Sequence, residues 1–190
     1  MKSLREQTPV RSTRVAEKKN YQLYRSQLAV DFNHRCGYCD VRDVYSKMPF
    51  EIDHFVPKGL DKDIPDNKYS NLVYSCRSCN NAKRRKWPTN NPKIHNDGHV
   101  GWVDPCSYDY DKQLGRDDNG YIIPLTEVGQ WMHHNLKLGQ SKHQVLWNIE
   151  QLEILTEQLS MDVDMDTLDP KVKQLILMQQ AMLKLIKSLW

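Results

Sequence analysis

Two patterns of apolar and polar residues divide this chain. In the first half, apolar residues recur near helical spacing from about Glu17 to Phe32, and two short apolar runs follow at 50–56 and 71–74. A helical period and then two short runs bounded by turn residues are typical of one helix and the two arms of a β-hairpin. A further helix is expected from Cys79 to just before Pro88, because proline ends helices.

The second half predicts helices after a turn-rich connector. Residues 91–125 contain several glycines and prolines, with candidate short strands at 99–104 and 120–123. Apolar residues at spacings of three and four then predict three helices, one at 126–138, one from Ser141 and one from Pro170. The last helix has more apolar residues than one contact face needs, which predicts either central burial or a surface for a partner.

The fold class that follows is α+β, with four segments along the chain. We expect a basic, poorly ordered arm at 1–16, a core with its leading helix at 17–90, a connector at 91–125 and a helical domain at 126–190. A chain of 190 residues is long enough for a small catalytic module and a helical domain beside it.

Composition favours a reducing, aqueous compartment. No apolar run approaches the roughly 20 residues that a membrane span needs, and the first residues lack the apolar stretch of a signal peptide. Four of the five cysteines lie in closely spaced pairs, which fits a reducing compartment better than a disulfide framework. We therefore expect a cytoplasmic protein without a membrane partner.

The net charge of +3 conceals a difference between the two halves. Residues 1–100 contain 19 Lys or Arg against 11 Asp or Glu, whereas residues 101–190 contain 8 against 13. Within ten residues, five positive charges follow one another without an acid, namely Arg77, Lys83, Arg84, Arg85 and Lys86. Solvated charge is the usual reason for such a run, but here we expect these residues and Lys58 to contact the phosphates of nucleic acid.

The cysteine pairs are the strongest chemical signal. Cys36 and Cys39 form one Cys-x-x-Cys motif, and Cys76 and Cys79 form a second. Two such pairs predict a structural zinc site with four thiolate ligands, because each pair presents two sulfurs to one ion. A redox motif is the alternative, but the chain lacks the βαβ pattern that accompanies one. The fifth cysteine, Cys106, is interpreted as a packed thiol.

The segment between the two cysteine pairs contains residue types that hydrolyse phosphodiesters. Asp53 and His54 are adjacent, Asn71 follows at the second predicted hairpin arm, and Asn80 lies directly after the last cysteine of the cluster. With the two cysteine pairs and Lys83, these residues resemble the HNH nuclease family over roughly residues 33–86. The family core is a β-hairpin followed by a helix, called the ββα-metal fold. Asn80 stands where the family often has its last histidine.

This resemblance implies a metal-dependent endonuclease that most often cuts DNA. His54 suits a general base, because neutral imidazole accepts a proton near physiological pH, and Asn71 would orient its ring. Asp53 and Asn80 offer the hard oxygens that Mg²⁺ or Mn²⁺ prefers. A looser likeness of the segment around Trp102 and Gly120 to HNH proteins encoded beside ATPases implies an anti-phage effector.

Two other functions stay open from the sequence. A non-catalytic zinc module that binds nucleic acid or protein would explain the cysteines and the basic run, but not Asp53, His54, Asn71 and Asn80. A nuclease that cuts RNA as a toxin would use the same residues. The acidic helical segment 126–190 is expected to mediate self-association or to dock a partner protein, such as an ATPase.

Overall fold

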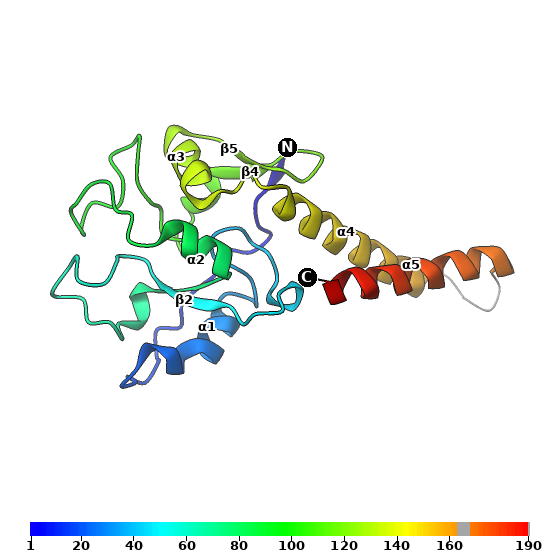
Figure 1. Ribbon diagram of the computed structural model, residues 1–190, viewed down its shortest axis with the longest axis horizontal. Coiled ribbons are helices and arrows are strands. Elements are labelled where there is room, and N and C mark those ends of the chain that lie inside the picture. The colour runs from blue at the N-terminus through cyan, green and yellow to red at the C-terminus, as the bar shows by residue number, and fades with distance from the viewer. Residues whose placement is uncertain (163–167, 190) are drawn as a thin grey trace.

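The computed structural model describes residues 1–162 and 168–189, with side chains over 1–159 and 168–184, and it has the α+β architecture that the sequence predicts (Figure 1). Its strands are short, and its two longest helices lie at the end of the chain. The strands are β1 (Lys2–Ser3), β2 (Glu51–His54), β3 (Leu72–Ser75), β4 (Leu114–Arg116) and β5 (Ile122–Pro124). The helices are α1 (Arg25–Asp31), α2 (Arg77–Lys83), α3 (Glu127–Leu136), α4 (Ser141–Asp162) and α5 (Pro170–Leu189).

A small hairpin-and-helix unit forms the centre of the first half. Strands β2 and β3 pair antiparallel, with Asp53 opposite Val73 and His54 opposite Leu72. Helix α2 begins directly after β3, and the Cys76 side chain accepts the Cys79 backbone N–H at its N-terminus. This order of two strands and a helix is the one that the HNH resemblance implies.

A second sheet, which sequence reasoning did not identify, lies beside this unit. Its strand order is β1–β4–β5, all antiparallel, so that the first residues of the chain pair with residues after position 113. The expected strand at 99–104 is absent from the described chain, where only an isolated bridge links Asn96 and Gly101. The candidate strand at 120–123 overlaps β5, which begins two residues later than predicted. Helix α3 packs against β5 and lies across from α2 (Figure 1).

The N-terminal segment is ordered, which corrects the expectation of a loose basic arm. Leu4 is buried in the main hydrophobic core, and the buried Arg5 pairs with the partly exposed Asp111. Arg11 binds the Leu72 carbonyl through Nε at 2.7 Å and Asp104 through Nη1 at 2.9 Å. Arginines that look free in the sequence are therefore paired with acids about a hundred residues away. The division of the chain into four segments stays a prediction.

One main hydrophobic core joins the hairpin unit to the second sheet. It includes Phe32 of the leading segment, Leu72 and Val73 of β3, and Trp102 and Leu114 from the second half of the chain. Because these residues share one cluster, the hairpin unit is packed against the β1–β4–β5 layer and does not stand alone. The leading helix is shorter than expected, since residues 21–24 form a 3₁₀ turn capped by Asn20 before α1 begins.

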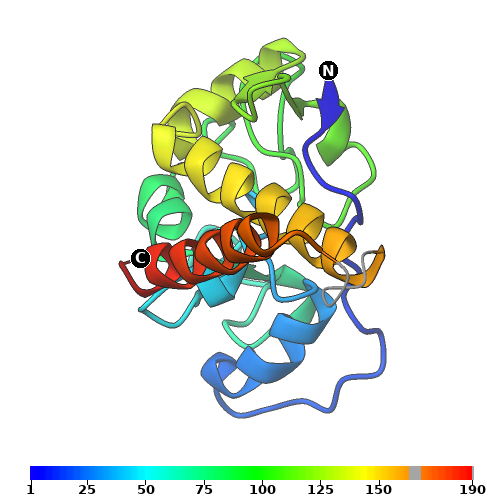
Figure 2. The same ribbon diagram turned by 90° about the vertical axis from the view of Figure 1, so that its right-hand side faces the viewer.

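Helices α4 and α5 lie side by side and extend away from the body of the molecule (Figures 1 and 2). The first part of α4 is anchored, because Arg35 pairs with Glu150 and the Tyr45 hydroxyl donates to Glu153. A small second core of Tyr45, Leu146, Ile149 and Leu183 joins the two helices to the body. Asp169 accepts the Lys171 N–H at the start of α5, as expected for a capping residue before proline.

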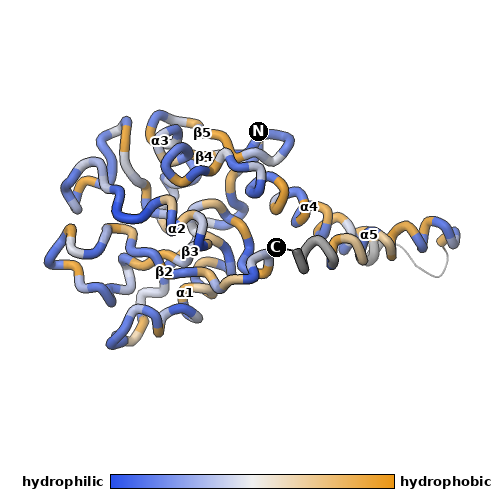
Figure 3. Tube along the Cα trace, viewed as in Figure 1, coloured by the Kyte–Doolittle hydropathy of each residue, from blue (hydrophilic) through white to orange (hydrophobic). Residues whose placement is uncertain are grey.

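Many apolar side chains of α4 and α5 remain exposed, and in Figure 3 hydrophobic segments alternate with hydrophilic ones along α4. Those on α4 are Val145, Leu152, Ile154, Leu155 and Leu159, and those on α5 are Val172, Leu175, Leu177, Met178 and Met182. Leu175 reaches 66 % exposure, which is high for a leucine on a helix that packs against another. Nevertheless, none of the described helices has the length and apolar character to cross a membrane.

Candidate active site and metal centre

The structure brings the four cysteines of the two motifs together. The sulfur atoms of Cys36, Cys39, Cys76 and Cys79 all lie within 4.8 Å of one another, and none of these thiols is in a disulfide. The Cys39 and Cys76 sulfurs are 3.9 Å apart. Four sulfurs at about 2.3 Å from a tetrahedral ion would be about 3.8 Å from one another. The cluster therefore has the spacing and chemistry of a site that can hold a metal ion.

Close packing around Gly37 shapes the first cysteine motif, which we call the knuckle (residues 36–39). A Cβ at Gly37 would lie 2.7 Å from the Phe32 ring and 2.9 Å from a Val73 methyl. Glycine is needed here because the knuckle touches the core, and not because the turn demands a left-handed backbone. The Gly37 N–H donates to the Tyr74 carbonyl at 2.9 Å, so the knuckle is also bound to β3.

His54 lies at the end of β2 with its ring enclosed by two segments. The ring is in edge contact with Tyr21, and its Nε2 is 2.7 Å from the Asp66 carbonyl oxygen. A carbonyl only accepts, so Nε2 carries the proton and Nδ1 keeps the lone pair. The residue is 7 % exposed, and this burial lowers the pKa of His54 from its ordinary 6.5. The ring is therefore neutral at physiological pH.

Asp53 points to the opposite face of β2, toward the knuckle and α2. The Tyr38 hydroxyl donates to its Oδ2 at 2.5 Å, and the Lys83 ammonium is 2.9 Å from the same oxygen. Both contacts use Oδ2, so among the described residues no protein donor binds Oδ1. Neighbouring residues of a strand face opposite sides, and the structure keeps this alternation for Asp53 and His54.

Lys83 is the clearest correction to the sequence-based assignment of phosphate contacts. Its exposure is 0 %, and besides pairing with Asp53 it donates to the His54 carbonyl at 2.9 Å. A side chain enclosed in this way has no surface on which a nucleic acid could bind. Lys83 instead joins α2 to both members of the Asp53–His54 pair.

Asn80, on α2, contacts Glu51, on the face of β2 that packs against α2. The Asn80 Nδ2 donates to Glu51 Oε2 at 2.5 Å, and the other Glu51 oxygen is 3.7 Å from Arg77 Nε. Since its amide nitrogen is used in this way, the Asn80 Oδ1 remains as an acceptor without a protein donor among the described residues. Glu51, Asp53 and Asn80 thus offer hard oxygens on the same side of the hairpin, which fits a hard divalent cation.

Asn71 contacts the backbone beyond His54 and not its ring. Its Nδ2 donates to the Val56 carbonyl at 3.0 Å, and its Oδ1 accepts the Val56 N–H at 2.9 Å. This two-way contact closes the loop between the two arms next to His54. In place of the expected hydrogen bond between Asn71 and the imidazole, the ring donates from Nε2 to the Asp66 carbonyl, and Asn71 binds only the backbone two residues after His54.

The remaining basic residues of the predicted nucleic-acid contact lie at the surface. Lys58 stacks over the Tyr21 ring at 4.1 Å and pairs with Asp66 at 3.0 Å. Arg85 donates to the Lys58 carbonyl at 2.9 Å, which links the end of α2 to the loop beside His54. Arg77, Arg84 and Lys86 are exposed at α2 or just after it. Positive charge therefore flanks the hairpin on the side where the loop and α2 meet.

Sequence reasoning missed several residues that shape the site. Tyr21 and Asp66 contact His54 but belong to no recognised motif, and Tyr38, which contacts Asp53, occupies an unspecified position of the first Cys-x-x-Cys motif. One signal was available for Lys83, because it lies four positions after Cys79 and so shares the inward face of the helix. The cavity of about 500 Å³ lined by Arg11, Thr13, Lys68 and Tyr69 contains none of the predicted site residues.

Comparisons with known proteins match the segment that carries the cysteine cluster and the Asp53–His54 pair. A family model described as HNH endonuclease matches residues 36–86, so the chain contains an HNH endonuclease domain. The chain is also similar to Septu protein PtuB of Bacillus thuringiensis, with 23 % identity over 141 residues, 70 % of this chain and 51 % of that protein. The chain thus spans about half the length of this curated relative. No solved structure matches the chain.

Proposed function

We propose that this protein is a metal-dependent endonuclease that hydrolyses phosphodiester bonds in DNA. The observation that carries the proposal is the Asp53–His54 pair, which Lys83 fixes on a hairpin arm within the matched HNH domain. A non-catalytic zinc module would need neither a neutral buried histidine nor unbonded carboxylate and amide oxygens nearby. The site residues therefore favour catalysis over simple binding.

His54 is the general base of the proposed reaction. With Nε2–H donated to Asp66, its Nδ1 can take the proton from a water molecule that attacks the phosphorus. The Asp66 carbonyl stabilises the imidazolium that results, since the N–H that it accepts becomes a stronger donor. Asn71 closes the chain behind His54 and keeps the ring from shifting with the loop.

Asp53 and Asn80 are the proposed ligands of one Mg²⁺ or Mn²⁺ ion, with Glu51 beside them. Asp53 Oδ1 and Asn80 Oδ1 have no protein donor among the described residues, so both are available to a cation. When bound, such an ion supplies positive charge for the phosphate and for the oxygen that leaves. Lys83 compensates part of the carboxylate charge at Asp53 and holds the strand against α2.

Zinc is the proposed occupant of the four-cysteine cluster. All four ligands are sulfur, the arrangement of closed structural zinc sites, and the ion would fix the knuckle and the start of α2. Thiols of this kind stay reduced in the cytoplasm, where we place the protein. The exposed residues Arg77, Arg84, Arg85 and Lys86 and the half-buried Lys58 are the proposed contacts for the nucleic-acid backbone.

We further propose that the exposed apolar residues of α4 and α5 dock a protein, either a second copy or an ATPase partner. The similarity to a Septu protein supports this role and the reading as an anti-phage effector. Apolar patches of this extent on helices mark interaction sites. Light scattering of the wild type tests self-association, and Leu175→Glu should abolish it. Val30→Glu, at an exposed position of α1 in the body of the molecule, is the control.

A plasmid assay tests the nuclease directly. The full-length protein with Mg²⁺ or Mn²⁺ should convert supercoiled plasmid to open or linear DNA, and EDTA should stop the reaction. Linear DNA and RNA of the same length, run in parallel, distinguish a DNase from the RNA-cutting alternative. Purified protein that binds DNA but leaves every substrate intact with both metals would show a binding module.

A further inference from the structure

Tyr38 connects the cysteine cluster to the proposed catalytic metal site. It lies inside the knuckle, between Cys36 and Cys39, and it is 1 % exposed. Its hydroxyl donates to Asp53 Oδ2 at 2.5 Å. A buried carboxylate with only one donor can rotate about its side-chain torsions. A second donor from a different element restricts that rotation.

Three separate elements meet at the Asp53 carboxylate. Strand β2 carries Asp53, helix α2 contributes Lys83, and the knuckle contributes Tyr38. Since both donors bind Oδ2, together they define where Oδ1 points. The knuckle is thus part of the device that presents a carboxylate oxygen to a cation, besides holding two of the sulfurs.

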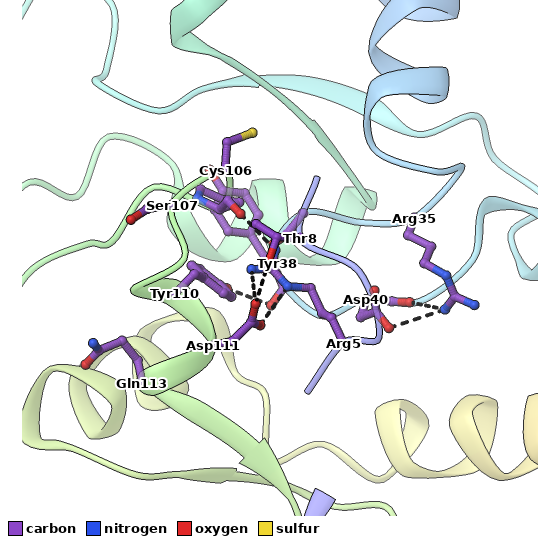
Figure 4. Close-up of polar contacts among 12 residues, drawn as sticks. Arg5, Thr8, Arg35, Tyr38, Asp40, Cys106, Ser107, Tyr110, Asp111 and Gln113 are labelled. Atoms are coloured by element: carbon purple, nitrogen blue, oxygen red, sulfur yellow. Dashed lines mark hydrogen bonds and ion pairs between the residues drawn. The ribbon is translucent and has the colours of Figure 1, made fainter. Parts of the chain in front are cut away.

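The knuckle itself is held by residues outside the matched HNH domain. Arg5 Nη1 donates to the Gly37 carbonyl at 3.5 Å, the Tyr110 hydroxyl donates to the Tyr38 carbonyl at 2.7 Å, and Arg116 Nη2 donates to the Cys39 carbonyl at 3.3 Å. Three consecutive carbonyls therefore have donors: Arg5 lies just after β1, Tyr110 just before β4, and Arg116 at the end of β4. Figure 4 shows Arg5 between Asp111 and the knuckle, with Tyr110 beside Tyr38.

These donors are themselves fixed. Arg5 binds both oxygens of Asp111 through Nε at 2.8 Å and Nη2 at 2.9 Å, and it lies over the Tyr110 ring at 4.5 Å. Asp111 also accepts the Thr8 hydroxyl at 3.2 Å. A bidentate arginine–carboxylate pair that is partly buried has little freedom to move. The chain of contacts thus runs from Asp111 through Arg5 and Tyr110 to the knuckle, and then to Asp53.

We propose that Tyr38 is a positioning residue that orients the Asp53 carboxylate for its cation, and that Tyr110, in the turn just before β4, holds Tyr38 in place. The inference rests on the proposed function, because it gives Asp53 the role of metal ligand. It accounts for the ordered N-terminal strand and for the connector as parts of the site's support. The HNH domain of this protein accordingly depends on both flanking segments for its metal affinity.

Tyr38→Phe in the full-length, zinc-loaded protein is the direct test. Mn²⁺ binding is measured by calorimetry, and the Mn²⁺ concentration for half-maximal plasmid cleavage is measured separately. The Mn²⁺ dissociation constant and the Mn²⁺ concentration for half-maximal cleavage should both rise by about ten- to a hundredfold, the usual effect of losing a hydrogen bond to a charged group. The cleavage rate at saturating Mn²⁺ should recover to near the wild-type value, and zinc content should be unchanged. A tyrosine with only a structural role would not lower Mn²⁺ affinity while leaving the rate at saturating Mn²⁺ and the zinc content unchanged.

Tyr74→Phe is the matched control, because Tyr74 is another buried tyrosine of the hairpin whose hydroxyl donates to a carboxylate, Asp43, at 2.8 Å. It should leave Mn²⁺ binding unchanged. Tyr110→Phe should weaken Mn²⁺ binding in the same direction as Tyr38→Phe but by less. It also replaces Tyr38→Phe as the test if that variant does not fold.

The outcomes separate this inference from the proposed function. If the wild type is active and Tyr38→Phe and Tyr74→Phe bind Mn²⁺ equally well, the positioning role is overturned but the nuclease activity stands. A wild type that cuts no substrate overturns the nuclease, and the calorimetric comparison of Tyr38→Phe with Tyr74→Phe then still decides whether Tyr38 supports a cation site. Loss of zinc together with Mn²⁺ binding in Tyr38→Phe also counts against the inference, because Tyr38 would then serve the cysteine cluster alone.

Discussion

Replacing Lys83 by methionine tests the buried pair at the centre of the site. Lys83 has no exposure, its ammonium is 2.9 Å from Asp53 Oδ2, and it donates to the His54 carbonyl at 2.9 Å. Methionine has a similar length but no charge, so Lys83→Met leaves the Asp53 carboxylate buried with only Tyr38 as a donor. Removing one member of a buried ion pair typically costs about 3–5 kcal/mol of unfolding free energy.

Urea unfolding at a fixed zinc concentration measures the effect. With an m-value of about 2 kcal/mol per molar urea, a loss of this size lowers the unfolding midpoint by roughly 1.5–2.5 M. Such a loss is large but within the about 5–15 kcal/mol by which folded domains are usually stable. Lys86→Met is the matched control, because Lys86 is exposed three residues later in the same basic run, and its change should stay within about 0.5 kcal/mol.

A double-mutant cycle makes the test specific. Asp53→Asn removes the carboxylate charge, so adding Lys83→Met to it should cost much less than Lys83→Met alone, with a coupling energy of about 1–3 kcal/mol. The alternative is that Lys83 contacts nucleic acid at the surface, as its place in the basic run predicts. If Lys83→Met unfolds at the wild-type urea midpoint while DNA binding weakens, the buried-pair argument is refuted.

The remaining predictions concern the base, its titration and the cysteine cluster. His54→Ala should slow cleavage by about 10²–10⁴-fold with zinc content and DNA binding nearly unchanged; Asp53→Ala should also be crippled, but raised Mn²⁺ should restore part of its activity. Burial lowers the pKa of His54 from its ordinary 6.5, and the neutral ring is the active form. Activity should therefore be lost only as pH falls below 6.5. A pH–rate profile whose acidic limb is centred above 6.5 would contradict this. Cys76→Ser should lower both zinc content by elemental analysis and the thermal midpoint, whereas Cys106→Ser should change neither zinc content nor activity.

Local spacing was enough to predict the centre of the fold. The two cysteine pairs, the Asp53–His54 pair and Asn71 all lie within one short stretch, so each constrains the next through a hairpin and a single helix. The α+β class, the hairpin and the start of α2 follow from that stretch. The helices after Thr126 follow from their apolar period, and Thr126 itself caps α3 by accepting the Gly129 N–H.

Long-range pairing explains most of what the sequence did not reveal. Strand β1 is two residues long and pairs with β4 at Arg116, so no local pattern marks either strand. Arg5 and Arg11 look like a solvated basic tail until Asp111 and Asp104 are placed beside them. The role of Lys83 was missed for a different reason, because a run of basic residues suggests surface charge, although the spacing of four residues from Cys79 marks the inward face of α2.

The opposite orientation of Asp53 and His54 constrains how a substrate can bind. Asp53 faces α2 and the knuckle, whereas His54 faces Tyr21 and the loop around Asp66, so the two groups do not share one pocket on a face of the sheet. Among the described residues, β2 pairs only with β3 and its other edge is unpaired. A phosphodiester that meets both side chains must therefore cross that edge, or the end of the strand at His54. Lys58 and Arg85 lie at that end, which places positive charge where the backbone of such a substrate would pass.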